Sequence, residues 1–195
     1  LNKQAEEELK NLRKVFASDK TLIEFEDPGA RGGTIKSTVA EIFKRTSKPI
    51  HQAACISAAA SYINAKKILE LGTAFGTTSL CMHFFNPEAS ICTLEGVSAI
   101  AEKAVTSLAI AKEGSIESKT GLFKVLLPDY IKENQNIDFV FMDGHHSGAA
   151  STDYLNQIYP ALSDIAIIAV DDIYYSSDME DFWNSMITDN RFEAG

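Results

Sequence analysis

The sequence predicts a three-layer α/β domain, in which a mostly parallel β-sheet carries helices on both faces and a helical extension precedes the sheet. Two observations support this prediction. From residue 66 onward, short apolar runs alternate with segments whose apolar residues recur at helical spacing, and this alternation is typical of a parallel sheet. The runs at 139–142 and 165–170 are also continuously apolar, as expected for strands covered on both faces.

The amino-terminal part, residues 1–64, is predicted to form a helical extension or cap. Its expected elements are helices at 6–16, 35–44 and 50–63 and, by composition, a loop at 27–33. Leu9, Leu12 and Phe16 share one face of the first helix. Because that apolar face needs cover, we expect that the chain could form a homodimer through this extension.

Residues 65–195 are predicted to carry the sheet, and the whole chain is expected to be effectively one domain. The expected strands are 68–71, 91–94, 137–142 and 165–170, with a weaker one at 115–118, and the expected helices are 77–85, 99–112, 123–133, 149–162 and 178–188. Right-handed crossovers place the carboxyl ends of all these strands at one edge of the sheet. The motifs that follow the strands should therefore meet at that edge.

Charge and composition indicate which binding partners and which cellular compartment suit this chain. The chain has 18 basic and 27 acidic residues, a net charge of −9, which disfavours binding to nucleic acid. No apolar stretch is long enough to span a membrane, and three scattered cysteines indicate a reducing cytoplasm. Lys44, Arg45 and Lys48 form the only small basic cluster of the first half, which we interpret as a solvated helix end.

The turn after the first predicted strand has a glycine spacing that separates two cofactors. Gly72 and Gly76 are four residues apart, whereas a dinucleotide fingerprint would need glycines where Ala74 and Thr77 stand. This spacing and the preceding Glu70 favour S-adenosylmethionine, which is bulky and cationic and has no pyrophosphate. The alternative is a tight strand-to-helix turn in an α/β protein of any function.

Glu95 and Gly96 end the second predicted strand. A carboxylate at this position can accept both ribose hydroxyls of a nucleoside, and a glycine beside it lets the backbone lie close to the adenosine. Glu95 is therefore a predicted cofactor-binding residue. The alternative is an acid that caps the helix beginning near Ser98.

Two further motifs follow later strands. Asp143 and His146 come after the run 137–142, where His146 could act as a general base. Asp171 and Asp172 come after 165–170 and, together with Asp143, could hold magnesium or calcium. The alternatives are a polar surface loop at the first motif and a solvated loop, with Asp172 as a cap, at the second.

In this order, the motifs resemble those of the class I S-adenosylmethionine-dependent methyltransferases, and most of all the small O-methyltransferases of the catechol and caffeoyl-coenzyme A type and related uncharacterised bacterial methyltransferases. The resemblance covers Pro49 to Trp183 and rests on residues 70–79, 94–96, 139–146 and 170–173. It implies a three-layer Rossmann-like methyltransferase fold. That fold usually ends with two more strands, and since only about twenty residues follow Ile173, we expect the protein to continue past Gly195.

The resemblance also implies roles for single residues. Cofactor contacts are implied for Glu70, Gly72 and Thr78 at the methionine and ribose, Glu95 at the ribose hydroxyls, Gly121 near the adenine and Asp143 below the sulfonium. In catechol-type enzymes a metal is held by acids that match Asp143 and Asp171, with an asparagine at the place of Asp172, and the catalytic lysine stands at the place of His146. These two departures disfavour a divalent metal without excluding it.

The predicted function is methyl transfer from S-adenosylmethionine to an oxygen of a small molecule, with His146, Asp143 and Asp171 as the candidate catalytic residues. Two alternatives are kept. One is an NAD(P)-binding Rossmann oxidoreductase, and the other is a binding module that holds S-adenosylmethionine without catalysis.

Overall fold

The computed structural model describes residues 1–29 and 32–193. Its central sheet has the strand order β5-β4-β3-β6-β7, and every neighbouring pair is parallel. The strands are β3 (Lys67–Leu71), β4 (Ser90–Glu95), β5 (Ile116–Thr120), β6 (Ile137–Met142) and β7 (Leu162–Val170). The predicted parallel sheet is therefore confirmed, including the weaker strand near residue 116.

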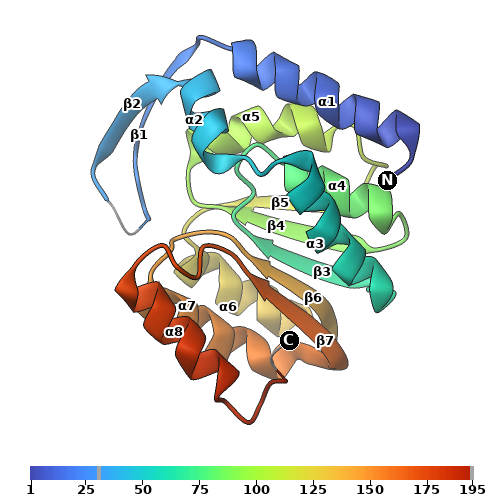
Figure 1. Cartoon of the computed structure of the whole chain (residues 1–195), viewed down its shortest axis with the longest axis vertical. Coiled ribbons are helices and arrows are strands. Elements are labelled where there is room, and N and C mark those ends of the chain that lie inside the picture. The colour runs from blue at the N-terminus through green and yellow to red at the C-terminus, as the bar shows by residue number, and fades with distance from the viewer. Residues whose placement is uncertain (30–31, 194–195) are drawn as a thin grey trace.

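Helices cover the two faces of this sheet, as Figure 1 shows. One face carries α3 (Ile50–Tyr62), α4 (Thr77–Phe85) and α5 (Ser98–Leu108), and the other carries α6 (Phe123–Glu133), α7 (Gly148–Ile158) and α8 (Ser177–Ile187). A 3-10 turn, η1 (Tyr159–Ala161), leads from α7 into β7. None of the described helices combines the length and apolar character that crossing a membrane requires.

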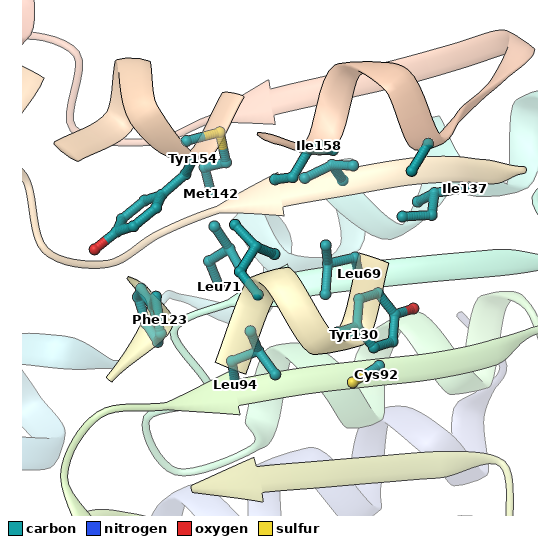
Figure 2. Packing of buried hydrophobic residues seen from close by; sticks show 13 residues of the cluster. Leu69, Leu71, Cys92, Leu94, Phe123, Tyr130, Ile137, Met142, Tyr154 and Ile158 are labelled. Atoms are coloured by element: carbon teal, nitrogen blue, oxygen red, sulfur yellow. The ribbon is translucent and has the colours of Figure 1, made fainter. Parts of the chain in front are cut away.

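The alternation of side chains along the strands builds two separate cores. Leu69 and Leu71 of β3 pack with Val140 of β6 toward α6 and α7, and Figure 2 shows the leucines in that cluster. Ile68 and Phe139 lie on the opposite face, toward α3 and α4. Because successive residues of a strand point to opposite faces, one continuous apolar run serves both layers.

The extension contains a β-hairpin that the sequence analysis missed. It runs as α1 (Lys3–Ser18), β1 (Leu22–Glu26), β2 (Thr34–Thr38) and α2 (Val39–Thr46), with β1 and β2 antiparallel. The predicted helix at 35–44 is therefore wrong over its first residues. Thr38 is the residue that precedes α2, and it forms a capping box with Glu41. Because this cap starts a helix, strand β2 ends at Thr38. Of the predicted loop 27–33, residues 30 and 31 lie outside the described part of the chain.

Helix α1 is covered within the chain itself. Leu9, Leu12 and Phe16 are buried, and the Phe16 ring lies 5.3 Å from the ring of Phe43 and 5.0 Å from that of Phe75. The apolar face that led us to expect a homodimer is thus satisfied without a second copy. The dimer stays a prediction that this helix no longer supports.

Strand β7 is more exposed than the other predicted continuously apolar strand, β6. It is the last strand of the described sheet and pairs only with β6. None of its residues is fully buried, and Ile165 is 74% exposed. Cover on both faces is nevertheless confirmed, since Ile168 packs toward α7 and α8 and Ile167 packs toward α3 and α4. The partial exposure arises because an end strand has a neighbouring strand on one side only.

Candidate active site

A cavity of about 1000 Å³ opens at the edge where the parallel strands end, a volume at the upper end of the range for small-molecule sites. It is bounded by the loops after β3, β4, β6 and β7 and by the extension. The predicted site residues that line it are Gly72, Glu95, Gly96, Asp143, His146 and Asp171. The topology therefore brings together six residues that are spread over a hundred positions of the sequence.

Four predicted cofactor residues do not line this cavity: Glu70, Gly76, Thr78 and Gly121. Glu70 is wholly buried and accepts hydrogen bonds from Ser79 and Thr93. Gly76 begins α4 with a φ of 72°. A direct contact between these residues and a cofactor remains a prediction.

Gly72 lines the cavity, as predicted, and its backbone conformation also has a structural consequence. Its φ is 111°, and a Cβ at this position would lie 2.1 Å from the backbone carbonyl oxygen of Asp143. Only glycine permits this approach without displacement of the backbone. Gly72 thus allows the loop after β3 to lie against the loop after β6.

Glu95 is fixed at the cavity wall by two backbone groups. The amide of Ala74 donates to Oε2 at 2.8 Å, and that of Val97 donates to Oε1 at 2.9 Å. Burial raises the pKa of Glu95, while these hydrogen bonds oppose the shift. The bond from Val97, the residue that precedes α5, is the kind of contact that the capping alternative predicts, and the carboxylate also lines the cavity.

Lys48 is a site residue that the sequence analysis missed. Its Nζ lies 2.7 Å from Asp143 Oδ2 and donates a second hydrogen bond to Asp171 Oδ2. The side chain is 10% exposed, so the interpretation of Lys48 as part of a solvated helix end is wrong, although Lys44 and Arg45 are exposed. Burial lowers the pKa of Lys48, but the two carboxylates outweigh it and raise the pKa above its usual value, which keeps Lys48 positively charged.

The two histidines of the β6–α7 loop face different partners. His145 Nδ1 lies 2.7 Å from the hydroxyl of Tyr154. His146 Nε2 lies 3.6 Å from Asp172 Oδ2, and its ring lies 5.2 Å from that of Tyr175. Burial lowers the pKa of His146 although the charge of Asp172 opposes it, which favours a neutral imidazole that can accept a proton.

Unusual backbone conformations gather around the cavity. Four non-glycine residues that line it have positive φ values: Ala74 (45°), His145 (70°), His146 (43°) and Asp172 (53°). Such conformations cost about 1–3 kcal/mol each, and they persist where the surrounding structure enforces them. Their concentration at one edge indicates that this edge is the functional part of the molecule.

The donor set does not fit the divalent metal that the resemblance implies. Asp143 and Asp171, which would hold that metal, are already bridged by the ammonium of Lys48. Asp143, His146 and Asp172 do offer ligand atoms within 4.8 Å of one another. A metal ion there would share Asp143 with a neighbouring cation, which repels it.

Several solved methyltransferases share this fold. The solved O-methyltransferase from Bacillus cereus in complex with S-adenosylhomocysteine (SAH) superposes with a TM-score of 0.73 at 17% identity, over 94% of this chain and 80% of that chain. The SAH-bound methyltransferase from Podospora anserina gives 0.70 at 15% identity, over 97% and 81%. The O-methyltransferase TomG from Streptomyces achromogenes, solved with SAM, gives 0.62 at 21% identity, over 80% and 69%. No curated protein matches the chain.

The family comparison agrees with the fold. The family model described as "Methyltransferase domain" matches residues 69–173, more than half of the 195 residues. This segment begins in β3 and ends just after Asp172, so it contains Gly72, Glu95, His146 and both strand-end acids. The resemblance predicted from the motifs is confirmed, and the chain belongs to this family of methyltransferase domains.

Proposed function

We propose that this protein transfers a methyl group from S-adenosylmethionine to an oxygen of a small molecule. One observation carries the proposal: a single cavity joins a half suited to the cofactor, with Glu95 and Gly96, to a half suited to acid–base chemistry, with Asp143 and His146. A cofactor and an acceptor bound in these two halves would lie side by side. A methyl transfer requires that arrangement.

The cofactor half fits an adenosine. The Glu95 carboxylate is held at the end of β4 and lines the cavity, a position that suits two ribose hydroxyls. Val97, Ile100 and Leu122 add apolar wall beside it, which suits a flat, weakly polar base. These features support S-adenosylmethionine as the cofactor, even though Glu70 does not line the cavity.

The acceptor half supplies the proton chemistry. When bound, S-adenosylmethionine supplies the methyl group, which leaves the sulfonium sulfur as a carbon–oxygen bond forms to the acceptor. His146 is the residue we assign to take the hydroxyl proton, because its imidazole lines the cavity and is favoured in the neutral form. The cavity walls contribute alignment and exclude water from the reacting atoms.

Calorimetric titration with SAH tests the proposal. We expect the wild-type protein to bind SAH, and Glu95→Gln to bind it roughly tenfold to a hundredfold more weakly, because a charge-assisted hydrogen bond is lost. Glu102→Gln is the matched control, since Glu102 is exposed on α5. Absence of SAH binding near millimolar concentration in the wild type would refute the proposed function.

The two alternative functions predict different results in cofactor binding and in a methylation assay. A dinucleotide-binding oxidoreductase would bind NADH or NADPH and not SAH. A non-catalytic module would bind SAH but would methylate none of a panel of hydroxylated acceptors incubated with labelled S-adenosylmethionine. Methylation of any acceptor in the panel distinguishes the enzyme from both.

The setting we propose is a reducing cytoplasm, with a small-molecule acceptor and without nucleic acid. Cys81 and Cys92 are buried and unpaired, and Cys55 is exposed and unpaired, a pattern that favours a compartment where thiols stay reduced. The net charge of −9 opposes association with a phosphate backbone. Thiol titration of the native and the unfolded protein would check the cysteine state.

A further inference from the structure

A lysine ammonium occupies the space between the two strand-end carboxylates. Lys48 lies in the segment between α2 and α3, and its Nζ contacts Asp143 and Asp171, the latter 123 positions away in the sequence. Asp143 follows β6 and Asp171 follows β7. One cation from the extension therefore joins the ends of two neighbouring strands at the acceptor half of the cavity.

The position of this ammonium is enforced from several sides. The backbone carbonyl of Lys48 accepts a 2.6 Å hydrogen bond from Arg13 of α1. The Nζ atom lies 5.3 Å from the centroid of the Phe141 ring, a distance at which a cation is attracted to an aromatic face. A lysine on the solvated surface would lack these two contacts. The fold itself therefore holds Lys48 between the two carboxylates.

We infer that Lys48 is a positioning residue that acts as the built-in cation of this site, so that no divalent metal is needed between Asp143 and Asp171. The inference rests on the proposed function, methyl transfer to an oxygen. The ammonium contributes one positive charge and contacts both carboxylates, the place that a bound divalent ion would otherwise take. Asp143 and Asp171 also share a side-chain hydrogen bond, and burial raises the pKa of Asp143 well above its usual value. Two of the three N–H groups of the ammonium are taken by these carboxylates, and the third remains for an acceptor oxygen.

The competing arrangement is a metal held by Asp143, His146 and Asp172. Their ligand atoms lie within 4.8 Å of one another, so geometry alone permits an ion there. However, Asp143 already has the ammonium of Lys48 at 2.7 Å, and a second cation on the same carboxylate would be repelled. The competing arrangement predicts metal binding by the wild-type protein, whereas our inference predicts metal binding only after Lys48 loses its charge.

Titration of the purified protein with Mn²⁺ alone separates these outcomes, with free Mn²⁺ followed by electron paramagnetic resonance. We expect no binding to the wild type up to about a millimolar, and binding to Lys48→Met that is tighter by roughly tenfold or more, because the repelling charge is gone. Lys48→Arg keeps the charge and should behave as the wild type does. Lys44→Met is the matched control, since Lys44 is a neighbouring but exposed lysine.

Submillimolar binding of Mn²⁺ to the wild type would overturn the inference, and so would a folded Lys48→Met that gains no binding. If Lys48→Met fails to fold, the wild-type and Lys48→Arg titrations still decide the question. SAH titration of the same samples reports separately on the proposed function. A protein that binds neither SAH nor Mn²⁺ would refute methyl transfer while leaving the bridging role of Lys48 supported.

Discussion

Glu70 allows a quantitative prediction, because its carboxyl group is completely enclosed by the protein. Its exposed fraction is 0%. Oε2 accepts hydrogen bonds from Ser79 and, at 2.7 Å, from Thr93, while Oε1 has no hydrogen-bond partner among the described residues. Burial raises the pKa of Glu70 from 4.5 to about 7, against the opposing effect of the two hydroxyls.

The sign of the resulting pH dependence follows from proton counting. Between the unfolded pKa of 4.5 and the folded pKa of about 7, the folded protein holds the Glu70 proton more tightly than the unfolded chain does. Stability from this group is therefore fully present below the lower value and is lost as the pH rises through the upper one. Between pH 5 and pH 8.5 the loss amounts to about 2.5 kcal/mol.

The assay is urea unfolding of the wild type and of Glu70→Gln at pH 5 and at pH 8.5. The amide cannot titrate, so the wild type should lose about 2.5 kcal/mol relative to the variant over this range. Any fixed cost of an unpaired amide group cancels in that difference. Glu88→Gln, at an exposed glutamate, is the control, and equal pH profiles for the wild type and Glu70→Gln would refute the argument.

Two further predictions concern packing. Gly72→Ala should destabilise the fold by about 3 kcal/mol or more in urea unfolding, because its Cβ would meet the Asp143 carbonyl oxygen at 2.1 Å. Gly114 also has a positive φ, 77°, but a Cβ there would lie in open space. Gly114→Ala should therefore lower the free energy of unfolding by only about 1–2 kcal/mol. An equal loss for both variants would contradict the collision argument. Phe75→Ala should cost about 3–5 kcal/mol, because the buried ring packs against Phe16 and Phe43 at 5.0 and 5.2 Å. A loss below 1 kcal/mol would show that this cluster does not fix the extension.

The sheet and its helices could be predicted because their signals are local and strong. The predicted helices at 77–85 and 123–133 match α4 and α6 residue for residue, since each lies between an apolar run and a turn. Glu95 and Asp143 could be placed at one edge because right-handed crossovers leave the carboxyl ends of parallel strands no other arrangement. Topology thus supplied long-range contacts that no short motif contains.

The predictions missed both the hairpin and the lysine bridge, for different physical reasons. For the hairpin a signal existed: Ile23–Glu26 alternates apolar and polar side chains, and Thr38 with Glu41 forms a capping box that marks where α2 begins. These local features indicate a strand before residue 27 and a helix that begins only after Thr38. For Lys48 no local signal exists, because its partners are 95 and 123 positions away and only the folded chain brings them together.

Both the family segment and the amino-terminal extension supply residues to the site. The family segment, 69–173, contains Glu95, Gly96 and the strand-end acids, which account for the cofactor half and for the negative charge of the acceptor half. The cation that compensates this charge comes from Lys48, outside that segment, and Pro28 of the hairpin would lie only 3.0 Å from a Cβ on Gly96. The extension is therefore part of the site as well as its cover. A change at Glu95, in the family segment, should therefore alter cofactor binding, whereas loss of the Lys48 charge, in the extension, should alter metal binding.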